Sequence, residues 1–131
     1  MAEASFLTPP QLRACSLFAD LSDASCERLL DRHRCSSHAA EQVFVMEQDW
    51  GESLFVLLSG IAKVRTYTAD GEEVVMSLLG EGEVFGEMAA LDGAPRSADV
   101  VALTPVRVVK LRAEPFSALL QQDAALALAL A

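Results

Sequence analysis

Three residues that together suit a phosphate-bearing ligand occur in the stretch EGEVFGEMAALDGAPRSADVV, residues 81–101. Gly86 lets backbone N–H groups approach a ligand closely. The helix formers at 88–91 predict a short helix, whose N-terminus offers unpaired N–H donors and the positive end of a dipole. The guanidinium of Arg96 is a charged fork that matches phosphate oxygens. The carboxylate of Glu87 repels phosphate, so it fits only if the ligand also presents hydroxyl donors. We therefore expect a sugar phosphate at this site.

Short β-prone runs separated by turn sequences surround this stretch and must position it. Asp70 and Gly71 predict a tight hairpin turn, because this pair adopts the positive φ angles that such turns need. Strands this short, with turn signals about every eight to twelve residues, indicate a sandwich or barrel. We expect a mainly β domain, a double-sheet jelly roll over residues 41–112. Its predicted strands are 43–46, 54–58, 61–67, 73–79, 97–103 and 106–111.

Helical segments are predicted on both sides of the strands, so that residues 1–131 form a single domain. Residues 9–38 are expected to hold N-terminal helices, since two prolines suit a first helical turn and Ser22 suits the N-cap of a helix from 23 to about 34. Residues 114–131 are expected to begin a C-terminal helix. The apolar positions expected to face the body of the domain are Leu12, Leu17, Phe18, Leu21, Cys26, Leu29 and Leu30.

His33 and His38 flank the polar stretch 34–40. Two histidines alone do not complete a metal site, because no carboxylate or third histidine stands at ligand spacing. We interpret both as solvent-facing loop residues. No motif of a nucleophilic or metal-dependent enzyme is present either, so we do not expect catalysis.

The sequence FGEMAALDGAPRSADV, residues 85–100, resembles the phosphate-binding cassette of cyclic-nucleotide-binding domains. This family includes CRP-like regulators, the regulatory subunits of protein kinase A and cyclic-nucleotide-gated channels. GESLFVLLSG, residues 51–60, is similar to a second signature of the family, and the resemblance extends over about residues 18–120. It implies the jelly-roll fold and a regulatory role in which a bound cyclic nucleotide changes the position of a C-terminal helix.

The resemblance also implies a role for each residue of the cassette, residues 85–98. Arg96 would pair with the phosphate oxygens, and Glu87 would accept a hydrogen bond from the ribose 2′-hydroxyl. Further contacts to the phosphate or sugar would come from Gly86, Met88, Ala89, Ser97 and Ala98. The base would lie against Val64, Met76 and Phe85, for which an ordinary core position is the alternative. A structural ion pair, for example between the two charged residues, is the alternative for Arg96. Serine after the arginine favours cAMP, and cGMP stays open.

The charge composition limits the kinds of partner that this chain can bind. The chain has 10 basic and 19 acidic residues, a formal net charge of −9, which argues against binding nucleic acid or an anionic membrane through this chain. The N-terminus lacks a basic region and a long apolar segment, so we expect a cytoplasmic protein rather than a secreted one. The expected partners are the nucleotide and either a second copy in a homodimer or an output domain outside this chain.

Two other functions remain open on the sequence. A ligand-free domain of the same fold could serve dimerisation or docking, although the intact pair Glu87 and Arg96 argues against a decayed site. Alternatively, the cysteines could make a redox or metal sensor. Their odd number and the absence of a CxxC pair instead favour free thiols at Cys15, Cys26 and Cys35.

Overall fold

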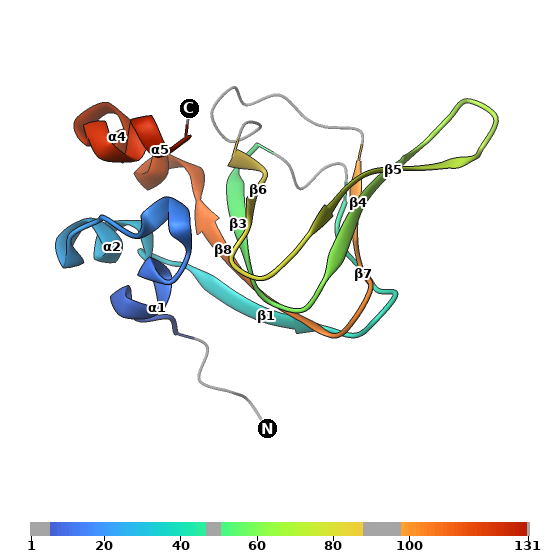
Figure 1. Ribbon diagram of the computed structural model, residues 1–131, viewed down its shortest axis with the longest axis horizontal. Coiled ribbons are helices and arrows are strands. Elements are labelled where there is room, and N and C mark those ends of the chain that lie inside the picture. Colours follow the sequence, from blue (N-terminus) through green and yellow to red (C-terminus); the bar gives the residue numbers. More distant parts are fainter. Residues whose placement is uncertain (1–5, 47–50, 88–97, 131) are drawn as a thin grey trace.

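The computed structural model describes residues 6–46, 51–87 and 98–130. Within these ranges the strands form two antiparallel sheets of four strands each, stacked as a jelly roll with the helices gathered at one side (Figure 1). The first sheet has the order β1-β8-β3-β6 and the second the order β2-β7-β4-β5. The strands are β1 (Arg34–His38), β2 (Val43–Val45), β3 (Ser53–Ser59), β4 (Ala62–Tyr67), β5 (Glu73–Leu79), β6 (Val84–Phe85), β7 (Asp99–Ala102) and β8 (Val106–Arg112).

Helices precede and follow the strands, as the sequence predicts. The N-terminal ones are α1 (Pro9–Arg13), a single 3₁₀ turn η1 (Ser16–Phe18) and α2 (Asp23–Leu29). The Ser22 side chain caps α2 by accepting a hydrogen bond of 3.1 Å from the backbone N–H of Ser25, which confirms the predicted N-cap. The C-terminal helices are α4 (Ala113–Gln122) and α5 (Ala124–Leu130), separated at Asp123, whose backbone is extended.

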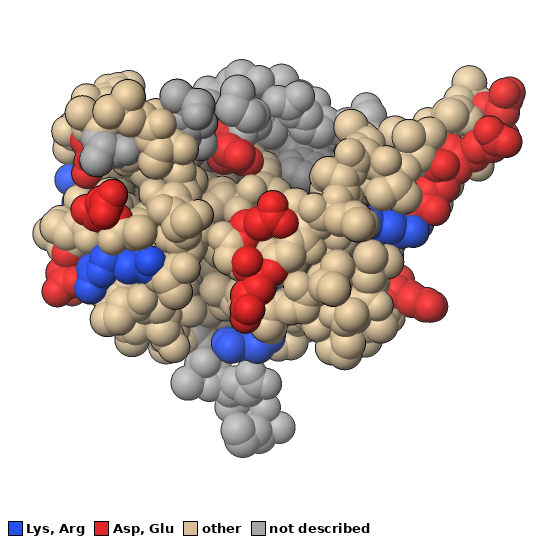
Figure 2. Space-filling view, viewed as in Figure 1, with Lys and Arg blue, Asp and Glu red and all other residues tan. Residues whose placement is uncertain are grey.

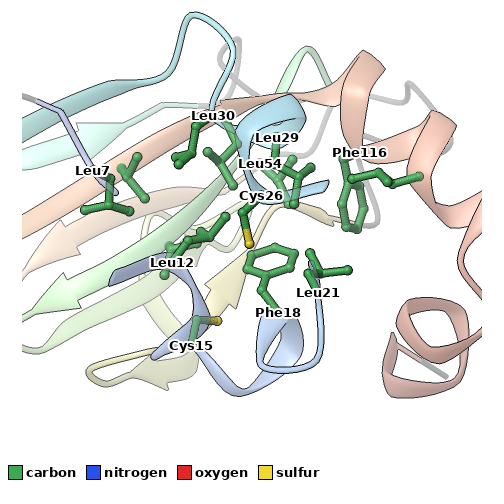
Figure 3. Close-up of a cluster of buried hydrophobic side chains, with 14 of the residues drawn as sticks. Leu7, Leu12, Cys15, Phe18, Leu21, Cys26, Leu29, Leu30, Leu54 and Phe116 are labelled. Atoms are coloured by element: carbon green, nitrogen blue, oxygen red, sulfur yellow. The ribbon is translucent and has the colours of Figure 1, made fainter. Parts of the chain in front are cut away.

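Buried side chains form two clusters, one on each face of the first sheet. Along β8, Val109 and Leu111 face the helices while Val106 and Val108 face the second sheet, because successive strand residues point to opposite faces. The helix-side cluster joins both helical regions (Figure 3). In it the rings of Phe18 and Phe116 meet edge to face, with centroids 6.4 Å apart. All the apolar positions predicted for the N-terminal helices are buried or partly buried there.

All six predicted strands are present, with bounds within two residues of those expected. The jelly-roll fold is therefore confirmed. Two strands were missed, β1 and β6. Strand β6 has only two residues, too few to show a periodicity.

The interpretation of the histidine region as helix and loop was wrong. Helix α2 ends at Leu29, and the chain then passes through Arg32 in a left-handed conformation (φ 58°) into β1. The segment 9–38 therefore ends in a strand that contains His38. A polar sequence can form this strand because β1 is at the edge of its sheet and much of it stays exposed.

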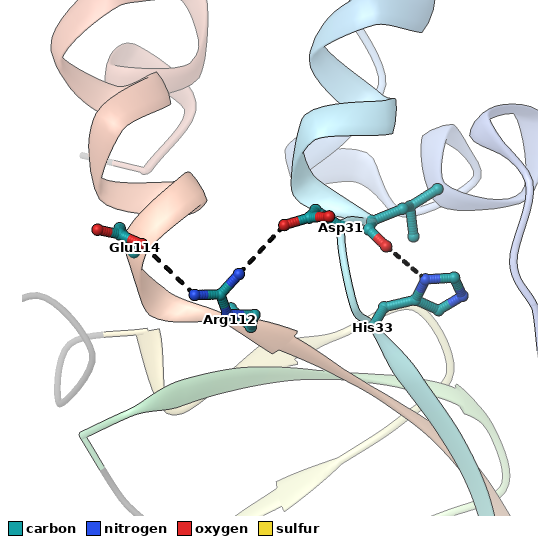
Figure 4. A network of polar contacts seen from close by, with 5 residues as sticks. Asp31, His33, Arg112 and Glu114 are labelled. Atoms are coloured by element: carbon teal, nitrogen blue, oxygen red, sulfur yellow. Dashed lines mark hydrogen bonds and ion pairs between the residues drawn. The ribbon is translucent and has the colours of Figure 1, made fainter.

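His33 is not a free loop residue either. Its Nε2 accepts a hydrogen bond from the backbone N–H of Leu7 at 2.8 Å, and its Nδ1 lies 2.6 Å from the carbonyl oxygen of Leu30. The ring therefore ties the N-terminal segment to the end of α2. Beside it, Arg112 contacts Asp31 at 3.1 Å and Glu114 at 3.4 Å, which links α2 to the start of α4 (Figure 4).

Candidate ligand-binding site

The described start of the cassette is a sharp change of backbone direction at the end of β6. Phe85 is 5% exposed and pairs with Phe55 of β3 in the register of the first sheet. Gly86 follows with φ +79°, a conformation that favours glycine, and Glu87 is already helical. The Glu87 side chain is half-buried. A backbone turn of this kind can present N–H groups to an anion, with one carboxylate held beside them.

Three of the predicted residues share one buried cluster. Phe85 and Ala98 belong to the cluster between the two sheets, and Val64 packs against it. Val64 of β4 lies opposite Val100 of β7, two residues after Ala98. The fold therefore brings the two described ends of the cassette, Phe85 and Ala98, close to Val64, one of the residues expected to contact the base. For Phe85 the structure also supports the alternative of an ordinary core position.

Met76 lies apart from this cluster. It belongs to β5, the edge strand of the second sheet, and is 61% exposed. The ladder shifts here, because Val64 is opposite Ser77 while Arg65 is opposite Val75, so Met76 has no residue opposite it. An ordinary core position is therefore wrong for Met76, and its side chain stays available for a contact.

The remaining predicted residues of the cassette, Met88, Ala89, Arg96 and Ser97, lie outside the described residues. Their assigned contacts with phosphate and sugar remain predictions.

An ion-pair network joins β4 to β5 and to β7, the strand that follows the cassette. Lys63 contacts Glu73 at 2.8 Å, and Arg65 contacts Glu73 at 3.5 Å and Asp99 at 3.7 Å. The hydrogen bond from Lys63 is the main cause that lowers the pKa of Glu73. Because Asp99 directly follows Ala98, Arg65 fixes the outgoing end of the cassette. Sequence reasoning missed this network, although opposite charges on neighbouring strands are a readable signal.

On the face shown in Figure 2, acidic side chains gather on the β4–β5 hairpin, among other places. A ligand with less negative charge meets less repulsion on such a protein.

The three cysteines are free thiols in the structure, as expected. Burial raises the pKa of Cys15, whose Sγ donates to the carbonyl oxygen of Gly82 at 3.1 Å. Burial also raises the pKa of Cys26 and of Cys35. Among the described residues no three histidine, cysteine, aspartate or glutamate side chains are grouped to hold a metal ion. No helix in the described part of the chain is long and apolar enough to cross a membrane.

Known proteins are similar to this chain in both sequence and fold. The family model described as "Cyclic nucleotide-binding domain" matches residues 36–123. A cAMP-dependent protein kinase regulatory subunit of Colletotrichum orbiculare is 34% identical over 109 residues, covering 83% of this chain and 27% of that protein. The cyclic AMP receptor protein of Thermus thermophilus is 36% identical over 74 residues, covering 56% of this chain and 34% of that protein. The chain thus spans about a third or less of these relatives.

A solved structure confirms the fold independently. The sensor domain of the transcriptional regulator DNR from Pseudomonas aeruginosa superposes with a TM-score of 0.81 at 24% identity. The match covers 92% of this chain and 81% of that structure. The family match covers most of the strands and the whole cassette, residues 85–98, and agrees with the resemblance read from residues 85–100. The chain belongs to the cyclic nucleotide-binding domain family.

Proposed function

We propose that this domain binds a cyclic nucleotide, cAMP in the first place, and acts as a regulatory module rather than an enzyme. One observation carries the proposal. In a member of this family, the left-handed Gly86 and the helical Glu87 directly follow Phe85, whose ring is fixed in the core. This geometry favours close approach of an anion to backbone N–H groups.

The phosphate would be bound by backbone N–H groups at residues 86–89 and by the guanidinium of Arg96, with Ser97 and Ala98 completing the site. A charge-assisted hydrogen bond of this kind contributes about 1.5–3 kcal/mol. Glu87 would accept the ribose 2′-hydroxyl. A purine base would lie against Val64 and the exposed side chain of Met76, where covering apolar surface stabilises the complex.

Electrostatics favour a cyclic phosphate over an open one. A phosphate diester carries one negative charge, whereas a monoester such as 5′-AMP carries about 1.5–2 at pH 7. In a chain of net charge −9, with the Glu87 carboxylate beside the ligand, the additional charge is repelled. We therefore expect the cyclic form to be selected.

The signal would pass through the C-terminal helices. Phe116 and Leu119 of α4 and Leu126 of α5 are buried in the same cluster as the N-terminal helices, so a ligand that repositions one helix must repack the others. The recipient would be an output domain or a second copy of the chain, in the cytoplasm.

Calorimetric titration of the full chain with cAMP, cGMP and 5′-AMP tests the proposal. We expect saturable binding of cAMP, weaker binding of cGMP and at least tenfold weaker binding of 5′-AMP. Arg96→Ala should weaken cAMP binding at least tenfold, since tenfold corresponds to about 1.4 kcal/mol. Arg107→Ala is the matched control, because Arg107 is exposed on β8 and should leave the affinity unchanged. If the chain bound none of the three nucleotides, or if Arg96→Ala left the affinity for cAMP unchanged, the assignment would be overturned.

A further inference from the structure

A cavity opens beside the edge strand β1. It has a volume of about 600 Å³, a size typical of small-molecule sites. Its apolar side is formed by Phe44, Val45, Phe55 and Val108, which belong to or pack against the cluster between the sheets. None of the described residues assigned to the nucleotide lines it. Phe85, which is assigned to the base, contacts the lining rings of Phe44 and Phe55, so the cavity adjoins the proposed nucleotide site without sharing its described residues.

The polar side of this cavity is basic in an acidic protein. Arg34 of β1 and Lys110 of β8 are direct cross-strand partners, so their side chains leave the sheet on the same face. Within the described part of the chain, neither side chain has an ion pair or hydrogen bond. The described lining contains no aspartate or glutamate, although the chain has 19 acids and 10 bases. Two unpaired cations placed side by side repel each other, and an anion between them removes that repulsion.

Aromatic rings stand next to these cations. Phe55 is the other cross-strand partner of Lys110 and faces the space between the sheets. The rings of His38 and Phe44, which also line the cavity, stack with centroids 4.9 Å apart and planes 15° apart. Phe6 lines the cavity from the N-terminal segment and is 80% exposed. A flat apolar ring fits such a lining, because aromatic side chains bind rings both through buried area and through their edge and face geometry.

Most of the remaining polar groups that line the cavity already have hydrogen-bond partners. Both ring nitrogens of His33 have hydrogen-bond partners in the backbone, and the Nε2 of His38 lies 2.9 Å from the hydroxyl of Ser36. Burial lowers the pKa of His38, which favours the neutral ring. Arg34 and Lys110 are the only arginine or lysine side chains of the described lining.

We propose that this cavity binds a small aromatic carboxylic acid, with the carboxylate between Arg34 and Lys110 and the ring against Phe44 and Phe55. The two cations supply the charge, and Arg34 can also bind a carboxylate through two parallel hydrogen bonds. The aromatic side chains supply the apolar contact.

Phenylacetate is the probe and phenylacetamide its matched neutral control, since the two differ in charge but hardly in shape. We expect phenylacetate to bind the full chain saturably and phenylacetamide to bind at least tenfold more weakly. Arg34→Gln and Lys110→Gln should each weaken phenylacetate binding at least fivefold. Arg107→Gln, an exposed substitution on the same strand as Lys110, should leave it unchanged. Thermal unfolding of each variant establishes that the fold is intact, as expected for exposed positions.

The site of binding is checked separately from affinity. The ring signals of His38 in NMR spectra should shift on adding phenylacetate, and Arg96→Ala should leave phenylacetate binding intact. Three results would overturn the proposal: equal binding of the acid and the amide, unchanged affinity in both glutamine variants, or loss of phenylacetate binding in Arg96→Ala. The last result would place the acid in the nucleotide site. Binding of phenylacetate without binding of any nucleotide would support this cavity and contradict the proposed nucleotide function alone.

Discussion

The rings of Phe55 and Phe85 stack nearly parallel, with centroids 5.1 Å apart and planes 14° apart. The pair joins a central strand to β6, which has only two residues and ends immediately before Gly86. Two backbone hydrogen bonds between Leu57 and residues 82 and 83 hold the segment before β6 to β3. The stack adds a side-chain contact at Phe85, the last residue before the cassette leaves the sheet.

Replacing Phe55 by leucine should affect the cassette more than its cost in stability suggests. The aromatic pair contributes about 0.5–1.5 kcal/mol beyond the buried area, and we expect a total loss of about 1–3 kcal/mol. Because β6 loses its stacking partner, the affinity for cAMP should fall at least threefold. Denaturant unfolding and calorimetry on the same sample measure the two effects.

Phe116→Leu is the matched control for Phe55→Leu. It also removes one ring of an aromatic pair, but in the helix-side cluster, where its partner is Phe18 rather than Phe85. We expect a similar loss of stability with a smaller change in affinity. Equal losses of affinity in both variants would mean that general destabilisation, and not the stack, explains the effect.

Gly60 is a position where the close approach of two turns excludes any side chain. Its φ is +92°, and a Cβ built there would overlap the carbonyl oxygen of Pro105 and lie 2.8 Å from Cγ1 of Val106. Gly60→Ala should therefore combine backbone strain of about 1–3 kcal/mol with an overpacking cost of about 1–3 kcal/mol. We expect a total loss of about 2–6 kcal/mol in denaturant unfolding.

Gly71→Ala separates these two causes. Gly71 has a similar φ of +85°, but no atom lies within 4 Å of the added Cβ. Only the strain remains, so the loss should be about 1–2 kcal/mol. If both alanine variants lost the same stability, the contact with the Pro105 turn would have no energetic effect.

The sequence predicted most of the strands because their turns carry glycine, proline or aspartate at the required positions. Residues 73–79 were placed with the bounds that β5 has, directly after the Asp70–Gly71 turn. Strand β1 was missed because RCSSH is polar and lacks the alternation that marks a half-buried strand. Its β character comes from pairing with β8, a contact between segments far apart in the chain.

The candidate site was predictable to a different extent. Gly86 and Glu87 could be proposed from the sequence because the motif is local, and Gly86 has a positive φ that favours glycine. Their contacts with a ligand stay predictions. The exposure of Met76 could not be predicted, because a one-residue shift in the pairing of β4 and β5 changes which face of the sheet a side chain occupies. The Arg34–Lys110 pair was equally hidden, since it exists only in the register of β1 against β8.

Glu73 should make stability depend on pH in the acid range. Its folded-state pKa lies below the ordinary value of 4.5, first because of the hydrogen bond from Lys63. The carboxylate therefore stabilises the fold above pH 4.5, and this contribution is lost as the pH falls through the lower, folded-state value. Glu73→Gln should be less stable than the wild type at pH 7, and the difference should disappear in strong acid.

Glu72→Gln provides the comparison for this prediction. Glu72 is exposed and adjacent to Glu73 in the chain. Its replacement by glutamine removes the same charge and leaves the contacts of Glu73 with Lys63 and Arg65 in place. Urea unfolding from pH 7 to pH 3 should give parallel curves for Glu72→Gln and the wild type, and a flatter curve for Glu73→Gln. High salt should reduce the difference, because these side chains are partly exposed. Identical curves for both variants would show that the Lys63 contact does not stabilise the fold.

Asp123 should control the order of the last helix. Its Oδ1 accepts a hydrogen bond from the backbone N–H of Leu126 at 3.0 Å, as an N-cap does, and Leu126 is only 2% exposed. Asp123→Ala should lose about 0.5–2 kcal/mol. Because α5 is terminal, the loss should appear as faster amide hydrogen exchange in α5 before it appears in global unfolding.

Asp123→Asn distinguishes the hydrogen bond from the charge. Asparagine caps helices as well as aspartate does, so exchange in α5 should stay close to that of the wild type. Exchange in Asp123→Asn as fast as in Asp123→Ala would instead assign the effect to the charge at the helix N-terminus.

The relay through the C-terminal helices is tested on the wild type. If these helices relay binding, amide hydrogen exchange in α5 should become slower on adding cAMP. Unchanged exchange at saturating cAMP would contradict that relay.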